Sequence, residues 1–287
     1  MTLRTAFFNP STGVLRAGWR IPWLILWAAP VFLGVGFLSK ALRPHFAGGA
    51  LLAVSAATGL LFILAALGVY RTFARVVERR RDLPELRLDG DTPRHAGLGF
   101  LLGGGTMLAI VAILSLAGSY HVDGANGPQT ILKALAFYLP QSFSEDFIFC
   151  LILFRLLKEG LGRKWALLIA PVLFSAAHLG NDHESLLGLL EIVTAGVLMY
   201  YAFDRTGSFY TVWGLHFSWN FTMNGIFGLS NSGQAIPGLL RSHVTGPTWL
   251  TGGATGPEAS VLALGFDVLL LLALLMVSDR RLRARVA

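Results

Sequence analysis

The sequence is poor in cysteine and in charge. Cys150 is the only cysteine among 287 residues, which excludes an intramolecular disulfide and a cysteine-rich metal site. Charged residues make up only 14% of the chain, against about 25% in an ordinary soluble domain. No soluble domain, internal repeat or low-complexity tract can be recognised. These absences argue against a soluble enzyme and against a disulfide-stabilised secreted protein.

Long hydrophobic runs make up much of the sequence. Apolar residues make up 54% of the chain, in runs of 18 or more that can cross a hydrocarbon core of about 30 Å. The 33 glycines suit close helix packing in lipid. We therefore predict an all-α, polytopic integral membrane protein with about eight transmembrane helices. The predicted spans are 19–41, 49–70, 97–117, 129–154, 164–180, 185–203, 208–228 and 258–278.

The basic residues predict the topology. Most of the 23 Lys and Arg fall in segments that share one side if the N-terminus is cytoplasmic. We expect a bacterial-type inner (plasma) membrane protein with both termini cytoplasmic. The expected parts are a cytoplasmic segment 1–18, a membrane domain 19–278 and a basic tail 279–287. The first span lacks a small-residue cleavage signature and is expected to remain as a helix.

The net charge of +7 follows from this topology. Inner loops rich in arginine face anionic headgroups, so membrane lipid is an expected partner. The basic run at 79–82 has no nucleic-acid-binding motif near it, so no nucleic-acid partner is expected.

A small set of polar residues interrupts the predicted spans. Lipid cannot solvate such groups, so each needs a partner and is either functional or a hydrogen-bonding contact between helices. The set is Lys133, Glu145, Asp146, His178, Glu191, His216, Asn220, Asn224 and Asp267.

Four members of this set are predicted to lie at one depth. At 1.5 Å per residue, Glu145, His178, His216 and Asn220 fall about 15–22 Å from the cytoplasmic face. His216 and Asn220 are four residues apart and share a helix face. Pro140 loosens the backbone bonding just before the acid pair. We therefore expect a water-filled cavity that opens toward Glu145.

A carboxylate beside imidazoles and water is suited to general-base hydrolysis. Asn220 can donate to a developing oxyanion. The H-E-x-x-H sequence of classical zinc proteases is absent. Glu145, His178 and His216 could hold a divalent metal such as zinc, whereas asparagine is a poor zinc ligand. The sequence leaves a metal cofactor open.

Three short motifs resemble the CPBP family of intramembrane proteases, which includes CAAX-processing prenyl endopeptidases and bacteriocin-immunity proteins. The family pattern is E-E-x-x-x-R, F-x-x-x-H and H-x-x-x-N on successive helices. The corresponding segments are "EDFIFC" (145–150), "FSAAH" (174–178) and "HFSWN" (216–220). The resemblance covers about residues 129–228. The stretches "DRTGSFY" (204–210), "NGIFGLSNSG" (224–233) and "GPEAS" (256–260) are also similar to the family.

The resemblance implies a role for each motif residue. Glu145 would activate the hydrolytic water together with His178. His216 and Asn220 would bind the scissile carbonyl or its oxyanion. Asp146 stands where the family's second Glu supports the first.

The chain also departs from the family pattern. Asp146 is one methylene shorter than the family's Glu, and Cys150 replaces the motif Arg. Arg155 lies about 15 Å along the same helix from Glu145 and cannot supply the missing cation. The loss of this cation would weaken activity, shift it to higher pH or abolish it. We expect Cys150 to pack as a small apolar residue.

The other polar and aromatic positions receive simpler interpretations. Phe174 is expected to pack one turn from His178. Glu191 either lines the cavity or ties helices together. Asp267 is interpreted as a contact between helices, with Lys133 as a candidate partner. At the last span, Pro257 and Glu258 are expected to form the helix start.

The combined interpretation is an intramembrane endopeptidase of the CPBP kind, acting on a peptide or membrane-protein substrate. One alternative is a catalytically silent family member that acts as a scaffold or bacteriocin-immunity factor. Another is a transporter with an acid–histidine proton relay, although the duplicated halves typical of transporters are not found.

Overall fold

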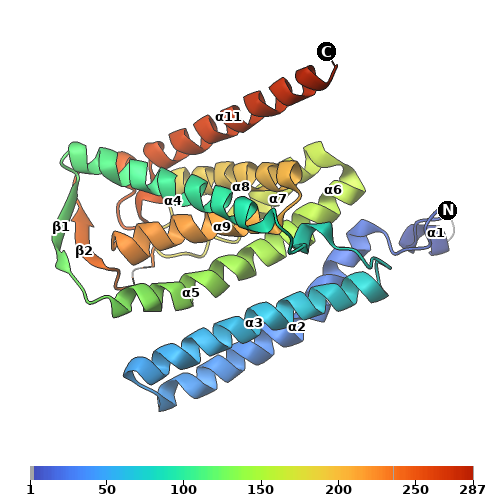
Figure 1. The fold of residues 1–287 in the computed structure, drawn as a ribbon, viewed down its shortest axis with the longest axis horizontal. Helices are drawn as coiled ribbons and strands as arrows, with labels where there is room; N and C mark the ends of the chain where they lie inside the picture. Colours follow the sequence, from blue (N-terminus) through green and yellow to red (C-terminus); the bar gives the residue numbers. More distant parts are fainter. Residues whose placement is uncertain (1–2, 235, 287) are drawn as a thin grey trace.

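The computed structural model describes residues 3–234 and 236–286, with side chains for 5–234 and 236–277. This part of the chain is mostly helical, as Figure 1 shows. The helices are α1 (Leu3–Phe7), α2 (Ala17–Leu42), α3 (Gly48–Val76), α4 (Thr92–Leu116), α5 (Gln129–Asp146), α6 (Arg155–Leu161), α7 (Arg163–Ala176), α8 (Leu186–Thr206), α9 (Phe209–Asn220), α10 (Thr248–Thr251) and α11 (Val261–Val286). The strands are β1 (Tyr120–Ala125) and β2 (Leu240–Val244).

Five helical segments are long and apolar enough to cross a membrane. They are Ala17–His45, Gly48–Val76, Thr92–Leu116, Gln129–Leu161 and Leu186–Thr206. A helix also occupies each of the other three predicted spans, but α7 and α9 have only 14 and 12 residues, and the apolar part of α11 is the shorter segment Val261–Val277. The chain is therefore a helical membrane protein, and the predicted count of eight spans is not confirmed.

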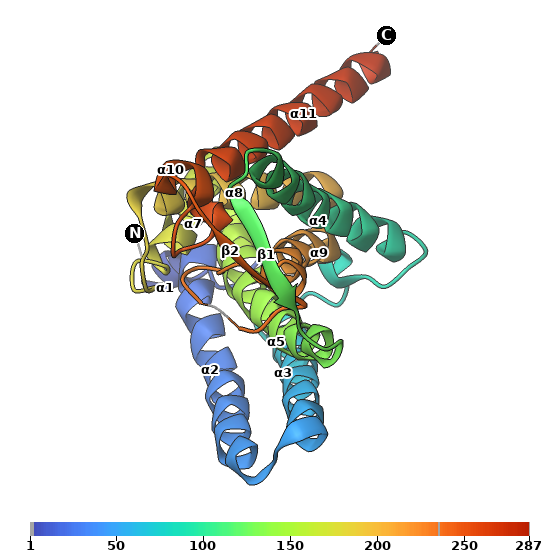
Figure 2. The same cartoon turned by 90° about the vertical axis from the view of Figure 1, so that its left-hand side faces the viewer.

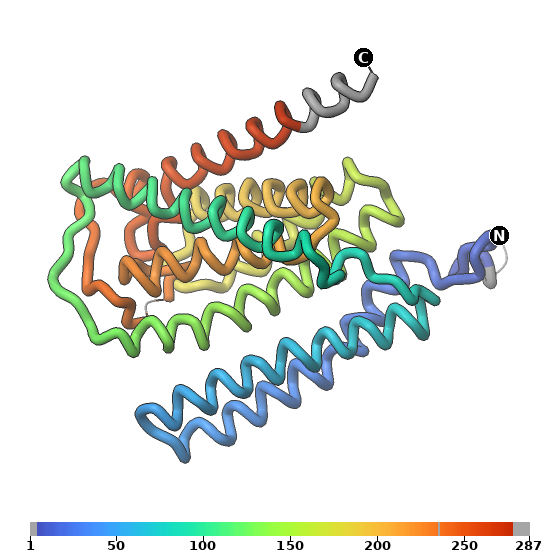
Figure 3. The backbone as a smooth tube through the Cα atoms, viewed as in Figure 1, coloured from blue at the N-terminus to red at the C-terminus, as the bar shows by residue number. Residues whose placement is uncertain are grey.

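The helices form a central bundle with two outlying parts. Helices α4, α5, α7, α8 and α9 pack together, while α2 and α3 form a hairpin whose α3 lies along α5 (Figure 1). Figure 2 shows this hairpin on one side of the bundle and α11 leaving on the other. The backbone trace in Figure 3 shows that α11 contacts the bundle near its start, on α8, and then diverges.

A short antiparallel sheet closes one end of the bundle, opposite α1 (Figure 1). Strand β1 follows α4, and β2 lies between α9 and α11. Tyr120 pairs with Val244, and the register shifts between Val122 and Gly124. The chain is consistent with the predicted all-α membrane protein, and this two-stranded sheet is a small addition that the prediction did not include. The two strands are about 120 residues apart and meet only because α4 and the segment after α9 reach the same end, which local sequence patterns do not reveal.

Glycines in α4 set the position of α9. A Cβ atom on Gly103 would lie 2.0 Å from the Leu215 carbonyl oxygen and 2.5 Å from Ser218 Oγ. The Gly104 N–H donates to Ser218 Oγ at 2.9 Å. Small residues of this kind allow helix backbones to approach closely in membranes. Leu215 precedes His216, so this contact also fixes a predicted site residue.

We expect Gly103→Ala to destabilise the protein by about 1–3 kcal/mol, because the new methyl group collides with backbone rather than with a movable side chain. Gly105→Ala is the matched control, since nothing lies within 4 Å of its Cβ position. Thermal unfolding of both purified variants in the same detergent checks this. Equal midpoints for the two variants would contradict the close α4–α9 contact.

An ion network joins α2, α3 and α6 near the end of α3. The buried Glu78 carboxylate accepts from Arg20 at 3.0 Å, Arg155 at 2.8 Å and Arg80 at 3.2 Å. Burial alone would raise the pKa of Glu78, but the guanidinium groups of Arg155, Arg20 and Arg80 outweigh it and hold the pKa below its usual value of 4.5. The Glu78 carboxylate is therefore the shared ion-pair partner of three buried or partly buried guanidinium groups.

We expect Glu78→Gln to cost about 3–5 kcal/mol of stability at neutral pH, because it leaves buried guanidinium groups without their anion. A carboxyl with a lowered pKa in the folded state contributes stability above its unfolded pKa, and that contribution is lost as the pH falls through the folded value. The difference in stability between wild type and Glu78→Gln should therefore become smaller below about pH 4.5.

The control is Glu159→Gln, because the Glu159 side chain also pairs with Arg20 but is 52% exposed. It should cost under about 1 kcal/mol. Thermal midpoints measured as a function of pH check both variants. If the difference in thermal midpoint between wild type and Glu78→Gln stays constant with pH, Glu78 is not the titrating group.

Candidate active site

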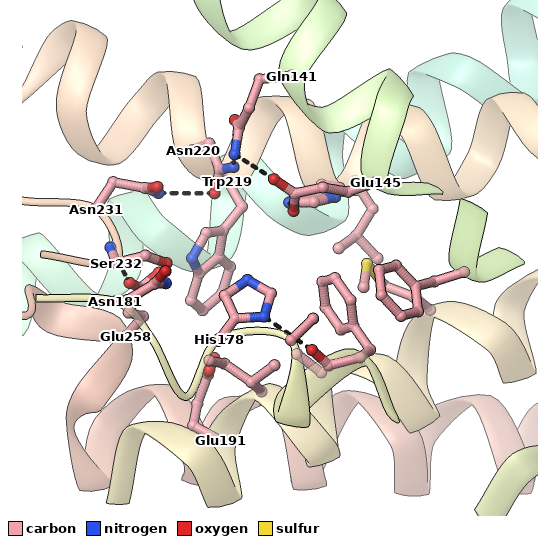
Figure 4. A pocket seen from close by; sticks show the side chains of 18 of the residues that line it. Gln141, Glu145, His178, Asn181, Glu191, Trp219, Asn220, Asn231, Ser232 and Glu258 are labelled. Carbon is pink, nitrogen blue, oxygen red and sulfur yellow. Dashed lines mark hydrogen bonds and ion pairs between the residues drawn. The ribbon is translucent and has the colours of Figure 1, made fainter. Parts of the chain in front are cut away.

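A cavity of about 230 Å³ lies among α5, α7, α8 and α9 (Figure 4). Its wall is mainly polar on one side, where carboxyl, imidazole and amide groups gather. The polar residues that line it are Gln141, Glu145, His178, Asn181, Glu191, His216, Asn220, Asn231, Ser232, Gln234, Glu258 and Asp267. The described lining residues include no Lys or Arg.

The cavity brings together residues that the sequence places on three helices. Glu145 from α5, His178 from the end of α7, and His216 and Asn220 from α9 all line it. Asp146 is 1% exposed and lies directly behind this wall, in contact with His216. The aromatic and acidic residues expected to support the site, Phe174 and Glu191, line the same cavity.

The two acids hold His216 between them. The ring atom Nδ1 lies 3.1 Å from Asp146 Oδ1, and Nε2 lies 3.6 Å from Glu145 Oε2. A carboxylate can only accept, so Nδ1–H is the donor to Asp146. The contact to Glu145 exceeds hydrogen-bond length, which leaves Nε2 free to engage another group. Asp146 Oδ2 is buried and has no hydrogen-bond partner in the described part of the chain.

A row of side-chain amides orients the Glu145 carboxylate. Gln141 Nε2 donates to Glu145 Oε1 at 2.6 Å, and Asn220 Nδ2 donates to Gln141 Oε1 at 3.4 Å. Asn231 Nδ2 donates to Asn220 Oδ1 at 2.8 Å, as Figure 4 shows. These bonds fix each amide so that nitrogen, not oxygen, faces the carboxylate side. The Glu145 side chain is 25% exposed and can reach water in the cavity.

His178 presents one ring nitrogen to the cavity. Its Nδ1–H donates to the Phe174 carbonyl at 2.8 Å, which leaves Nε2 as an acceptor. The Phe174 ring packs edge-on to His178 with centroids 4.8 Å apart and also contacts His216 at 6.1 Å. Ser175 Oγ donates to the Leu189 carbonyl at 2.8 Å and ties this end of α7 to α8.

Wide helical turns follow both central motifs. A π-helical segment, Phe147–Phe154, begins directly after Asp146, and another, Phe221–Ile226, begins directly after Asn220. Segments of this kind are rare and frequently occur at functional sites. Each one changes the helical register directly beyond the motif, since a π-helical turn holds more residues than an α-helical turn.

The position of the motif Arg is apolar in this structure. Cys150 is fully buried in the main hydrophobic cluster. Arg155 instead binds Glu78 and lies over the Tyr70 ring, 5.4 Å from its centroid. In the described part of the chain, no Lys or Arg forms an ion pair with Glu145 or Asp146. His216 is the basic side chain that contacts both acids, and Asp146 Oδ2 has no partner in the described residues.

Segments beyond the third motif complete the cavity. The Ser232 N–H donates to the Glu258 carboxylate, and the side chain of Asn231 reaches Asn220. The expectation that Glu258 starts the last helix was wrong. Pro257–Ala259 is a separate 3-10 turn, and α11 begins at Val261. The sequence signal for this wall was the family-like stretches 224–233 and 256–260, to which the motifs assign no role.

Glu191 and Asp267 meet across α8 and α11. Their carboxyl groups share a hydrogen bond, and both line the cavity. The proposed pairing of Asp267 with Lys133 was wrong, because Lys133 lies in a different groove between α2, α3 and α5. Sequence position could not reveal this contact, since α11 could have packed on any face of the bundle.

The candidate metal ligands are not arranged as a metal centre. Nδ1 of His178 binds a backbone carbonyl and Nδ1 of His216 binds Asp146, which leaves both Nε2 atoms free, so the geometry of the whole set decides the question. Within the described residues, no group of three or more His, Cys, Asp or Glu side chains is placed to hold a metal ion. A zinc-type set of Glu145, His178 and His216 does not fit this geometry, so no step below is assigned to a metal.

Comparison with known proteins agrees with the motifs. Residues 126–222 match the family model of the Rce1-like type II CAAX prenyl endopeptidases. The CPBP-family resemblance is confirmed. The matched third of the chain contains all three motifs, whereas Asn231, Glu258 and Asp267 lie beyond it. No curated protein and no solved structure matches the chain. The family implies a protease-type enzyme that acts on a peptide or protein in a membrane setting.

We expect Cys150 to be inert toward a membrane-permeant maleimide in the folded protein, because its thiol is fully buried. Unfolding in detergent should expose it to full labelling, which mass spectrometry can count. As a control, Ser11→Cys places a thiol at an exposed position and should label in the folded state. Rapid labelling of folded wild type would contradict the packing of Cys150.

Proposed function

We propose that this protein is an intramembrane endopeptidase that hydrolyses a peptide bond in or near the membrane with water activated by Glu145. The observation that carries the proposal is the Glu145 carboxylate itself. It is held by Gln141, lies 3.6 Å from His216 and opens into a cavity that His178 and Asn220 also line. These are the groups that general-base hydrolysis requires, and all of them line one cavity.

In the first step, a water between Glu145 and His178 gives a proton to the Glu145 carboxylate, and its oxygen forms a bond to the scissile carbonyl carbon. His178 Nε2 accepts the water's second hydrogen bond and orients the attack. The carbonyl π electrons move to the oxygen, which becomes an oxyanion. In the second step, the C–N bond breaks as the Glu145 carboxyl returns its proton to the leaving nitrogen. The products are a carboxylic acid and an amine.

Donors for the oxyanion come from α9. The Asn220 amide nitrogen faces the carboxylate side of the cavity, because Asn231 occupies its oxygen. His216 carries a proton on Nδ1 for Asp146, and a second proton on Nε2 would be free for the oxyanion. Asp146 is then a positioning residue that holds the ring. The resemblance to the family implies in addition that Asp146 supports Glu145.

The proposal includes a cellular setting. The five membrane-length helices and the distribution of Lys and Arg favour a bacterial-type plasma membrane with both termini cytoplasmic. The substrate is a peptide or membrane protein, and no residue of the cavity points to a prenyl group in particular.

We expect Glu145→Gln to lower the hydrolysis rate by about 10²–10⁴-fold, because the amide cannot accept the water proton. The measurement is cleavage of a library of membrane-anchored peptides by the purified, lipid-reconstituted protein, followed by mass spectrometry. Glu159→Gln removes an acid far from the cavity and should retain wild-type cleavage. Equal cleavage by Glu145→Gln and wild type would refute the proposed role of Glu145.

One observation favours a second candidate function. The site lacks the motif cation, and Cys150 fills that position with an apolar side chain. A catalytically silent family member that acts as a scaffold or immunity factor would have this feature. Under that alternative, wild type cleaves nothing, and Glu145→Gln leaves the cellular phenotype of the protein unchanged.

A further inference from the structure

The cavity has a second acidic wall, away from the acid pair. It consists of Glu191 from α8, Asp267 from α11 and Glu258 from the 3-10 turn before α11. None of the three forms an ion pair with Lys or Arg in the part of the chain that the structure describes. Only Glu258 has a clear backbone donor, the Ser232 N–H. The hydrolytic steps proposed above use none of these carboxyls.

Asp267 is incompletely satisfied within the protein. Asp267 is 2% exposed, its carboxyl group meets that of Glu191, and its Oδ2 has no hydrogen-bond partner in the described residues. An unpaired buried oxygen costs free energy, so a native structure that retains one is expected to satisfy it with another group. Asp267 also lines the cavity, so a donor bound in that space lies against this residue. The free oxygen therefore points to a ligand that donates hydrogen bonds.

The carboxyl groups of this wall indicate which class of ligand can bind there. A Lys ammonium or an Arg guanidinium offers three to five N–H donors and no acceptor, which suits several carboxyl groups at once. A metal ion fits less well, since no three ligands converge within the described residues. A free C-terminal carboxylate would meet a wall of like charge and no Lys or Arg. The wall therefore favours an organic cation.

We propose that Glu191 and Asp267 form a subsite for a basic side chain, Lys or Arg, close to the scissile bond of the substrate. That the bound cation belongs to a substrate rests on the proposed function, whereas cation binding at this wall does not. Glu191 and His178 each stand about 22 Å along their helices from the inner ends of α8 and α7, and the Ser175–Leu189 bond ties the two helices together. In the view of Figure 4, Glu191 lies beside His178 on the side away from Glu145.

Binding can be tested without activity. The probes are n-octylguanidinium and n-octylurea, which have the same shape and differ in charge. A ligand that binds the folded state raises the thermal midpoint, so the purified full-length protein is melted with each compound. Wild type should gain more stability from the guanidinium than from the urea. Asp267→Asn and Glu191→Gln should each reduce the apparent affinity for the guanidinium about 10- to 100-fold, the usual effect of one charge-assisted contact.

The matched control is Asp123→Asn, which removes one exposed negative charge on β1, outside the cavity. It should respond as wild type does. If guanidinium and urea stabilise wild type equally, or if neither substitution removes the difference, the cation subsite is refuted. Two separate substitutions are used so that one misfolded variant does not decide the outcome.

Cleavage gives the second readout. The membrane-anchored peptide library should show Lys and Arg enriched near the cut sites of wild type, and Asp267→Asn should lose this enrichment while still cutting peptides with neutral residues there. Cleavage without enrichment would refute the substrate subsite and leave the endopeptidase standing. No cleavage, together with a guanidinium preference that Asp267→Asn removes, would refute the endopeptidase and leave the cation site standing.

Discussion

The contact of one imidazole with two adjacent carboxyl groups is the constraint on which the site depends. His216 can reach Asp146 and Glu145 together only if α9 lies against α5 at one depth and one rotation. Cys150, at the position of the family's motif Arg, supplies no cation to the acid pair. The Cys150 thiol is buried and free, and a thiol packs as a small apolar group that needs no hydrogen-bond partner.

The rest of the fold serves to hold this contact. Glycine packing on α4 fixes the height of α9, and the amide row from Asn231 to Gln141 fixes the direction of the Glu145 carboxylate. The Ser175 bond to α8 sets where the end of α7 presents His178. The ion network around Glu78 lies beyond the apolar segment Phe147–Phe154, at the start of α6, and anchors the α2–α3 hairpin. Function and stability therefore depend on different charges, which substitutions can separate.

Much of the site could be predicted from the sequence, because lipid makes a buried polar residue conspicuous. Glu145, His178, His216 and Asn220 stand out from apolar surroundings, and helical rise alone places them at a common depth. The spans α2 and α3 could be predicted because their apolar runs are long enough to cross a membrane. The short helices α7 and α9 satisfy the hydropathy pattern but not the length, which is why the count of eight spans is not confirmed.

Contacts between distant segments could not be predicted in this way. The pairing of β1 with β2, the bond from Asn231 to Asn220 and the meeting of Glu191 with Asp267 all depend on how helices rotate and lean. Glu258 was interpreted from its neighbours as a helix start, yet its partner is Ser232, on another segment. Local patterns report what a residue can do, and tertiary packing decides which partner it meets.

The protonation of the His216 ring is the measurement that tests this account most directly. Nitrogen NMR of protein labelled at histidine, with His216→Gln for assignment, reports which ring nitrogens carry hydrogen. The account expects a protonated Nδ1 that donates to Asp146, and the loss of that signature in Asp146→Asn. An unprotonated Nδ1 in wild type, or a signal that ignores Asp146→Asn, would mean that the acids do not hold the ring, and the arrangement proposed for hydrolysis would be contradicted.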